Sequence, residues 1–378
     1  MKKVLILYGS YGGGHLSAAK AIKKEIEEEY KNVECMMIDC IEYVDKYFNK
    51  VTIELYKELA KKAPKIWGTA YDIAKDGFAA RVNTENNKLM SLKLRKLIQD
   101  YNPDLIINTH PFGSQMCGFL KKHELIDCKI ATIMTDFHIH PQWIVYGEYI
   151  DYFFVSNDRM REDTIDIGID SGKVYVTGIP VGDNFRKNFD RAKICEKIGL
   201  DPEKEVILFF AGGEFGLGRN NTIKVLEALI NVFPTLQIVA ISGRNLKMYG
   251  MFNNTVERNG ASDRIKVFEF TDKVPELMSI SKFVITKAGG LTLSESLVSH
   301  LPILVINPIP GQEEENTEFL EEEGAAIWIR KSDNPVDIFQ NLTMEKLKSM
   351  KKKASELARP NSTRDICHLL MDDLKYLN

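Results

Sequence analysis

Short apolar runs alternate with helix-like segments from the first residues of the chain. Val4–Tyr8 is apolar, Gly9–Gly14 is rich in glycine, His15–Tyr30 repeats apolar residues at helical spacing, and Val33–Ile38 is apolar again. A strand, a glycine turn, a helix and a second strand in this order form a βαβ unit, which builds a parallel sheet.

The same alternation continues in two series. After a mostly helical stretch at residues 41–99, the first series has predicted strands at Leu105–Asn108, Lys129–Met134, Tyr152–Val155 and Lys173–Val176, with a helix at Asn157–Ile167. The second series has predicted strands at Val206–Phe210, Leu236–Ile241, Ile265–Phe268, Phe283–Thr286 and Ile303–Ile306, with a helix at Arg219–Asn231. Two such series predict an α/β protein with two Rossmann-like, doubly wound domains facing a cleft, where loops at the carboxyl ends of the strands bind ligands.

The length of the chain, 378 residues, also favours two domains over one core. We place the hinge at Thr177–Gly182, which contains two glycines and a proline. The predicted domains therefore span residues 1–182 and 183–358. A final helix within residues 359–378 is expected to pack back on the N-terminal domain.

Composition narrows the class of protein. A net charge of −3 excludes a globally basic nucleic-acid binder. Six scattered cysteines lack the spacing of a zinc site and fit unpaired thiols in a reducing cytosol. No apolar stretch approaches the roughly 20 residues that span a bilayer, so any membrane contact is expected to be peripheral.

The first glycine turn carries the sequence G-S-Y-G-G-G-H. Its spacing differs from G-x-G-x-x-G and it lacks the Gly-Lys-Ser/Thr of a P-loop, which disfavours a nicotinamide or ATP site. His15 falls at the predicted helix start, where the helix dipole lowers its pKa and favours the neutral form of a base. A histidine that merely caps the helix is the alternative.

A polar loop follows the predicted strand that ends at Met134. It contains Asp136, His138, His140 and Trp143. Two histidines and an aspartate are conceivable metal ligands, but this spacing is weak evidence for metal. Acceptor binding or proton transfer is the favoured interpretation.

A second glycine turn follows the predicted strand Phe283–Thr286. Gly289 and Gly290 would expose N–H groups at a helix N-terminus, which binds anions, and Lys287 would add positive charge. Glu295 is suited to accept hydrogen bonds from ribose hydroxyls. Alternatively, Thr292 and Glu295 form a capping box that needs no ligand.

Hydrogen-bonding side chains also gather after the strand Ile303–Ile306. The loop Pro308–Asn316 suits a polyhydroxylated sugar, and a solvated charge run is the alternative.

Four motifs together resemble one enzyme family. They are G-G-G-H-x-x-A-A-x-A-I, T-D-F-x-x-H-P-x-W, T-K-A-G-G-x-T-x-x-E and P-G-Q-E-x-x-N. In this order they are similar to the monogalactosyldiacylglycerol synthase and processive diacylglycerol glucosyltransferase family, a relative of the N-acetylglucosaminyltransferase that makes lipid II. The resemblance covers Val4 to about Trp328 and so includes both predicted domains.

This resemblance implies a GT-B fold and an inverting transfer that needs neither metal nor cofactor. It implies UDP-glucose or UDP-galactose as the donor and diacylglycerol as the acceptor, at the cytoplasmic face of the cell membrane. The N-terminal domain would bind the acceptor and the membrane, and the C-terminal domain would bind the nucleotide sugar.

The resemblance also implies roles for individual residues. His15 and Asp136 would be the catalytic pair, with Asp136 favoured as the base and His15 as a donor-side group, although the sequence leaves this open. Acceptor contacts would come from His138, His140 and Trp143. Donor contacts would come from Gly13, Gly14, Gly212, Gly213, Glu214, Phe270, Thr271, Lys287, Gly289, Gly290, Thr292, Glu295, Gln312, Glu313 and Asn316.

Membrane contact is predicted for Tyr47–Trp67, a basic segment with interfacial aromatic residues that suits an anionic leaflet. Its expected lipid contacts are Lys57, Lys61, Lys62, Lys65 and Trp67. An ordinary surface helix is the alternative, and Lys88–Lys96 is then the next candidate.

Two other functions stay open at this stage. One is a related enzyme that uses UDP-N-acetylglucosamine, either a transferase to a lipid-linked muramyl acceptor or an epimerase. The other is a GT-B protein that senses UDP-sugars without turnover, although the presence of His15, Asp136, Glu295 and Glu313 argues against it.

Overall fold

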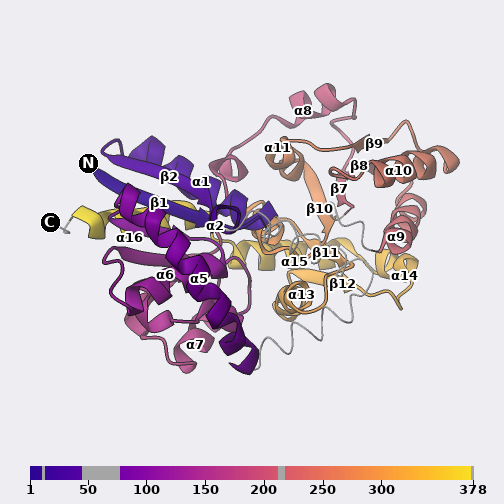
Figure 1. The fold of residues 1–378 in the computed structure, drawn as a ribbon. Coiled ribbons are helices and arrows are strands. Elements are labelled where there is room, and N and C mark those ends of the chain that lie inside the picture. Colours follow the sequence, from indigo (N-terminus) through magenta and orange to yellow (C-terminus); the bar gives the residue numbers. More distant parts are fainter. Residues whose placement is uncertain (11–12, 45–76, 212–217, 376–378) are drawn as a thin grey trace. The chain divides into compact units, whose positions relative to one another are not determined.

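The computed structural model describes residues 1–10, 13–44, 77–211 and 218–375, with side chains inside the helix at 77–101 described from Lys88 onward. These residues divide into two compact units. The first unit holds the described residues up to Gly182 together with those from Arg359 onward, and the second runs from Asp183 to Ala358. Each unit is an α/β structure with its own six-stranded sheet (Figure 1).

All neighbouring strands of the first sheet pair in parallel, in the order β2-β1-β3-β4-β5-β6. The strands are β1 (Lys2–Tyr8), β2 (Val33–Asp39), β3 (Leu105–Asn108), β4 (Lys129–Ile133), β5 (Tyr152–Val155) and β6 (Val174–Val176). The helices are α1 (Gly13–Glu29), α2 (Cys40–Val44), α5 (Gly77–Tyr101), α6 (Pro111–Lys122), α7 (Asp158–Asp166) and α16 (Ser362–Lys375), with short 3₁₀ turns η1 (Pro141–Trp143), η2 (Gly147–Tyr149) and η3 (Ser171–Lys173).

Strand β1, which lies between β2 and β3, is apolar from Val4 to Leu7 because both faces of its sheet are covered. Val4 and Ile6 pack in a cluster with α1 and α16, while Leu5 and Leu7 pack in a second cluster with α2, α5 and α6. All four side chains are fully buried. Successive residues of a strand point to opposite faces, so a continuous apolar run is what a sheet between two helix layers requires.

Helix α16 joins residues at the end of the chain to the first sheet. The Ser362 hydroxyl donates to the Ile179 carbonyl, and the Thr363 hydroxyl donates to the Val181 carbonyl. The Tyr152 hydroxyl of β5 donates to the Asp373 carboxylate at 2.5 Å. These bonds and the apolar contacts with α1 place the final helix in the same unit as the first strand.

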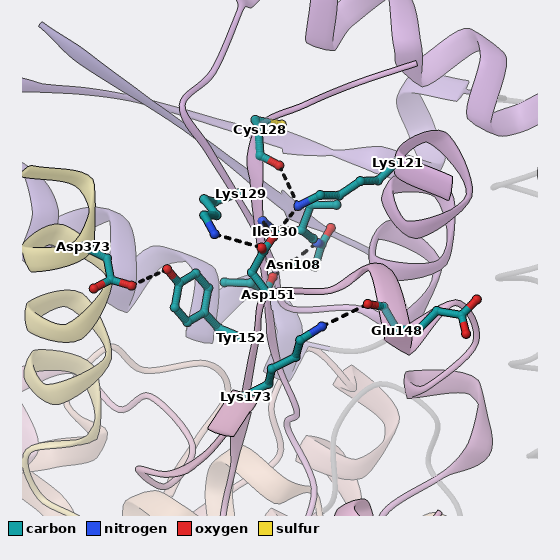
Figure 2. Close-up of polar contacts among 11 residues, drawn as sticks. Asn108, Lys121, Cys128, Lys129, Ile130, Glu148, Asp151, Tyr152, Lys173 and Asp373 are labelled. Carbon is teal, nitrogen blue, oxygen red and sulfur yellow. Dashed lines mark hydrogen bonds and ion pairs between the residues drawn. The ribbon is translucent and has the colours of Figure 1, made fainter. Parts of the chain in front are cut away.

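Asp151, just before β5, forms an ion cluster at the amino ends of the strands (Figure 2). Its carboxylate accepts from Lys121 at 2.5 Å, from Lys129 at 3.1 Å and from the main-chain N–H of Ile130 at 2.9 Å. Lys121 also donates to the Cys128 carbonyl. The cluster therefore ties α6, β4 and β5 together at the edge of the sheet that is remote from the glycine turn.

The second sheet is also parallel, in the order β12-β11-β10-β7-β8-β9. Its strands are β7 (Val206–Phe210), β8 (Gln237–Ile241), β9 (Ile265–Phe268), β10 (Ser281–Thr286), β11 (Ile303–Ile306) and β12 (Ala326–Ile329). The remaining elements are η4 (Asp183–Arg186), α8 (Arg191–Ile198), α9 (Arg219–Val232), α10 (Leu246–Arg258), α11 (Val274–Ser279), α12 (Gly290–Val298), α13 (Gln312–Glu322), α14 (Pro335–Gln340) and α15 (Met344–Leu357).

The predicted fold class is confirmed, and the strand predictions agree with the structure to within two residues at each end. Strand β12 and helix α6 were not predicted from the pattern. Within the described residues, no helix combines the length and apolar character needed to cross a bilayer. All six cysteines are unpaired.

Candidate active site

The carboxyl ends of the first sheet's strands gather polar residues at one edge. The register pairs Tyr8 with Asp39 and Asn108 with Thr132, so the residues that follow β1, β3 and β4 emerge side by side. Because parallel strands end at the same edge, the loops after them form a common surface. His15, Thr109 and Thr135 meet at this edge.

His15 lies in the first turn of α1, and its ring contacts a main-chain carbonyl and a side-chain hydroxyl. Its Nδ1 atom is 2.6 Å from the Thr109 carbonyl oxygen and 3.1 Å from the Thr135 hydroxyl oxygen. The Thr109 hydroxyl in turn donates to the His15 carbonyl at 2.9 Å. A carbonyl oxygen only accepts hydrogen bonds, so Nδ1 carries the proton of the neutral ring and Nε2 is left as the basic nitrogen.

Burial lowers the pKa of His15 to about 4, although the hydrogen bond to Thr109 acts in the opposite direction. The ring is therefore neutral at physiological pH. The helix-dipole argument anticipated a lowered pKa, but removal of the imidazole from water is the main cause.

His110 packs against His15 in an edge-on arrangement, with ring centroids 4.6 Å apart. Its own Nδ1 accepts the Phe112 N–H and thereby caps α6. Burial lowers its pKa well below the usual value. A Cβ on Gly9 would lie only 2.9 Å from the His110 ring, so glycine at that position makes room for the imidazole.

The predicted acceptor loop lies beside this pair of histidines. Trp143 is buried in η1, and its ring centroid is 6.3 Å from that of His15. His140 caps η1 by accepting the Gln142 N–H. The Gln115 amide donates to both the main chain and the side chain of Gln142, which fastens the loop to α6.

Asp136 and His138 belong to the same loop. Asp136 is only 5% exposed, and its carbonyl accepts the Ser156 hydroxyl. His138 is half-buried. The partner found at His15 Nδ1 is the Thr109 carbonyl rather than the Asp136 carboxylate, so the arrangement differs from a carboxylate-oriented histidine.

Asp39 organises the start of the glycine turn. Its carboxylate accepts the Ser10 hydroxyl and also the main-chain N–H groups of Ile41 and Glu42 at 3.0 Å. The end of β2 therefore holds both the turn after β1 and the first turn of α2. Gly13 and Gly14 are the first two residues of α1 and lie immediately before His15.

The second unit presents a glycine turn between β10 and α12. Gly289 is the N-cap of α12 and Gly290 its first residue, so their N–H groups lie at the positive end of the helix dipole. Lys287 is 8% exposed. Asn316 is fully buried, and its amide donates to the Ala288 carbonyl at 3.1 Å, so it supports this turn from α13.

The capping-box alternative for Glu295 is wrong. The N-cap of α12 is Gly289, so Thr292 lies inside the helix, and no side chain caps this helix. Glu295 is half-buried, and no hydrogen bond to its carboxylate is found among the described residues. Burial raises the pKa of Glu295 to about 8. A half-buried carboxyl group with a raised pKa is a candidate for ligand binding.

Helix α13 begins with the P-G-Q-E motif. The Glu313 carboxylate accepts the Ile309 N–H at 2.8 Å, and the Glu314 carboxylate accepts the Gly311 N–H at 3.4 Å. Gln312 is exposed. One carboxylate oxygen of Glu313 therefore fixes the loop between β11 and α13 through the Ile309 N–H.

Phe270 and Thr271 follow β9. Phe270 is 68% exposed, and the Arg244 guanidinium lies 5.5 Å from the centroid of its ring. The Thr271 hydroxyl accepts the Lys273 N–H at 3.0 Å. An exposed aromatic ring at the end of a strand can stack on a base.

Some predicted residues lie outside the described part of the chain. These are Gly212, Gly213 and Glu214 of the glycine-rich loop at residues 212–218, which follows β7, and Lys57, Lys61, Lys62, Lys65 and Trp67 of the membrane segment. The glycine loop's end is described: Gly218 has a φ of +65°, and a Cβ there would collide with the Asn307 side chain. Over the residues that the structure describes, no group of three or more His, Cys, Asp or Glu side chains could hold a metal ion.

The structure adds site residues that the sequence analysis missed, namely Thr109, His110, Thr135 as a contact of His15, Arg244 and Asn307. The signal for the first two was present, because Asn108-Thr109-His110 is a polar run directly after an apolar strand. It is the same pattern that identified the loop at Asp136.

Comparison with solved structures defines the class of fold. The chain is similar to Staphylococcus aureus MnaA in complex with UDP, with a TM-score of 0.66 and 16% identity over 100% of this chain and 98% of the other. It is similar to Acinetobacter baumannii MurG, with a TM-score of 0.60 and 14% identity over 98% and 100% of the two chains. The two Rossmann-like units thus form a GT-B type fold.

Sequence comparison then gives the family. Residues 15–181 match the family described as monogalactosyldiacylglycerol (MGDG) synthase, and residues 207–370 match the glycosyltransferase family 28 C-terminal domain. The chain is 30% identical to the processive diacylglycerol β-glucosyltransferases of Bacillus pumilus and Bacillus licheniformis, in each case over 97% of this chain and 93% of the relative. The chain belongs to this family of glycosyltransferases, as its four motifs indicated.

Proposed function

We propose that this protein transfers glucose or galactose from a UDP-sugar to the free hydroxyl of diacylglycerol, with inversion at the sugar carbon. The named relatives support diacylglycerol as the acceptor and favour glucose. A solved structure of similar fold with UDP bound supports a UDP-sugar as the donor. The observation that carries the proposal is the neutral His15, whose Nδ1 is bound by the Thr109 carbonyl.

His15 is the proposed general base. Its Nε2 takes the proton of the lipid hydroxyl as that oxygen forms a bond to the sugar carbon, and the bond from that carbon to UDP breaks. The Thr109 carbonyl keeps Nδ1–H in place and stabilises the imidazolium that results. The sequence favoured Asp136 as the base. The contact between His15 Nδ1 and the Thr109 carbonyl supports His15 in this role instead. Asp136 is then proposed only as a residue of the acceptor loop.

The departing UDP gains negative charge, which the second unit is suited to receive. The N–H groups at Gly289 and Gly290 and the ammonium group of Lys287 supply positive charge at one turn. Glu295 would accept from the ribose hydroxyls, and the exposed Phe270 would stack on the uracil. Glu313 and Gln312 would bind sugar hydroxyls.

The transfer is proposed to need neither metal nor cofactor, because helix N-termini and a lysine can stabilise the leaving group. Activity that disappears in chelator and returns with Mg²⁺ or Mn²⁺ would contradict this.

The proposed place of action is the cytoplasmic face of the membrane, with peripheral binding to anionic lipids. Besides Tyr47–Trp67, helix α5 supports this. Leu89 is 71% exposed and Leu92 is 48% exposed, and Lys96 follows at helical spacing on the same face. An apolar strip with lysines can insert into an anionic surface.

The deciding experiment is a product analysis. The purified protein is mixed with vesicles that contain diacylglycerol and with equal amounts of UDP-glucose, UDP-galactose and UDP-N-acetylglucosamine. Mass spectrometry should find a hexosyl diacylglycerol, and NMR of the product should show a β linkage from the α-linked donor. A product with N-acetylhexosamine, epimerised donor, or donor binding without turnover would contradict the proposal.

A further inference from the structure

We propose that Thr135 is a positioning residue that acts on the transfer through His15, which rests on the proposed role of His15 as the base. The carbonyl of Thr109 explains which nitrogen of His15 carries the proton. It leaves unexplained why a second oxygen, the Thr135 hydroxyl, lies 3.1 Å from the same nitrogen.

The geometry gives Nδ1 two oxygen neighbours from two different strand ends. Thr109 follows β3 and Thr135 follows β4, and the two strands are paired in register from Leu105 with Lys129 onward. Thr135 is 5% exposed, so its hydroxyl does not have bulk water as an alternative partner. Since Nδ1–H is directed to oxygen on both sides, rotation of the ring about its bond to Cβ would lose both contacts.

Two other aromatic rings lie near the His15 ring. His110 packs against it edge-on, and Trp143 lies beyond at 6.3 Å between centroids. His110 is a titratable neighbour of His15, and burial keeps it neutral, so its ring adds no charge near His15. The polar neighbours of Nδ1 are therefore the groups that respond when the ring becomes positive.

A hydrogen bond to a charged group is stronger than one to a neutral group. The Thr135 hydroxyl therefore stabilises the imidazolium more than the imidazole and increases the basicity of Nε2. It affects the proton-transfer step and should leave UDP binding unchanged, because the proposed UDP-binding residues other than Gly13 and Gly14 belong to the second unit.

The test compares three variants with matched volume or chemistry. Thr135→Val removes the hydroxyl and keeps the shape, and Thr135→Ser restores it. Thr132→Val is the control, because Thr132 is a buried residue of β4, the strand that precedes Thr135, and its hydroxyl bonds Ser114 at 2.7 Å instead of His15. Circular dichroism and thermal melts establish that each variant is folded.

We expect Thr135→Val to lower kcat by about 3- to 10-fold, the factor that one hydrogen bond is worth, with KM for the UDP-sugar within about twofold of the parent. The acidic limb of the kcat profile should move to lower pH. Thr135→Ser should recover most of kcat, and Thr132→Val should leave kcat and the acidic limb unchanged. Equal losses in Thr135→Val and Thr132→Val would show a merely structural role and overturn the proposal.

A second readout needs no turnover. In ¹⁵N-histidine-labelled protein, the ring N–H of His15, assigned by its absence from His15→Gln, should exchange with water faster in Thr135→Val than in the parent and Thr135→Ser. Unchanged exchange together with unchanged kcat would overturn the contact itself. Faster exchange with unchanged kcat would overturn the action on transfer, and full activity of His15→Gln would separately overturn the proposed base.

Discussion

The Nδ1 atom of His15 lies 2.6 Å from the main-chain oxygen of Thr109. This contact joins the first turn of α1 to the end of β3, 94 residues further along the chain. Because the acceptor is a main-chain oxygen, no side-chain substitution at residue 109 removes it, and the orientation of the ring is built into the fold.

The first prediction concerns the identity of the base. His15→Gln should lower kcat by roughly 10²- to 10⁴-fold, the usual contribution of a general base, while UDP affinity changes little. Asp136→Asn should lower kcat less, because the neighbours of the His15 Nδ1 atom are the Thr109 carbonyl and the Thr135 hydroxyl. Steady-state kinetics and calorimetry with UDP measure both. If Asp136→Asn abolishes turnover and His15→Gln keeps most of it, the two roles must be exchanged.

The ionisation of His15 can be measured directly. Burial lowers its pKa to about 4, below the ordinary 6.5, so the ring should remain neutral down to about pH 5, with the proton on Nδ1. NMR spectra of ¹⁵N-labelled histidine report both the tautomer and the titration. A midpoint near 6.5, or a proton on Nε2 at neutral pH, would contradict the geometry.

A substitution at Glu295 should separate stability from binding. Burial raises the pKa of Glu295 to about 8, so the folded chain keeps a proton that the unfolded chain releases above its ordinary pKa. Stability should therefore fall as the pH rises from about 4.5 through 8. Glu295→Gln removes this penalty and should stabilise the free protein at pH 8 by roughly 2 kcal/mol, less than the full shift implies because the side chain is half-buried.

The same Glu295→Gln variant should bind UDP about 10-fold more weakly above pH 8, where Glu295 is ionised and the substitution removes a charged acceptor for the ribose. Urea unfolding at pH 6 and pH 8 and calorimetry with UDP test the two effects. Glu318→Gln, an exposed change on α13, is the control and should alter neither. A loss of stability with unchanged UDP affinity would contradict the proposed role of Glu295.

The ion cluster of Asp151 should matter for stability alone. Burial opposes its ionisation, but hydrogen bonds from Lys121, Ile130 and Lys129 prevail and lower the pKa of the Asp151 carboxyl. Its contribution is therefore present above the unfolded pKa of about 4 and is lost as the pH falls below it. Asp151→Asn should cost about 2 kcal/mol at pH 7 in urea unfolding. The exposed Asp166→Asn should cost under ~0.5 kcal/mol, and similar costs for both would refute the assignment.

The membrane proposal has a matched control within the chain. Replacing Leu89 and Leu92 by Ser should weaken sedimentation with anionic vesicles, since both side chains are exposed beside lysines. Leu246→Ser changes a leucine that is 67% exposed in the second unit and should have no effect. Turnover of a short-chain, water-dispersible diacylglycerol should be preserved in all variants. Equal vesicle binding by the parent and the α5 variant would return attention to Lys57, Lys61, Lys62 and Lys65.

The two sheets and the approximate ends of their strands could be predicted from the amino-acid pattern. A strand buried on both faces must be apolar along its length, so Val4–Tyr8 and Val206–Phe210 could be recognised without their partners. Strand β12 was not predicted, although with four residues it is as long as β11. The polar residues that follow the strands were also visible, since sheet geometry brings them to one edge.

Tertiary structure decided which of these polar residues touch. The partner of the His15 Nδ1 atom is the main-chain carbonyl of Thr109. Every residue has such a carbonyl, so the residue types in the sequence do not indicate which one His15 contacts. The N-cap of α12 is Gly289, and only the three-dimensional helix start shows that Thr292 and Glu295 form no capping box. Burial sets the ionisation of His15 and Glu295, and burial depends on residues that are distant in sequence. The local pattern of apolar and polar residues thus predicts which side chains reach the edge of a sheet. Packing between segments that are distant in sequence determines the protonation states and hydrogen-bond partners of those side chains.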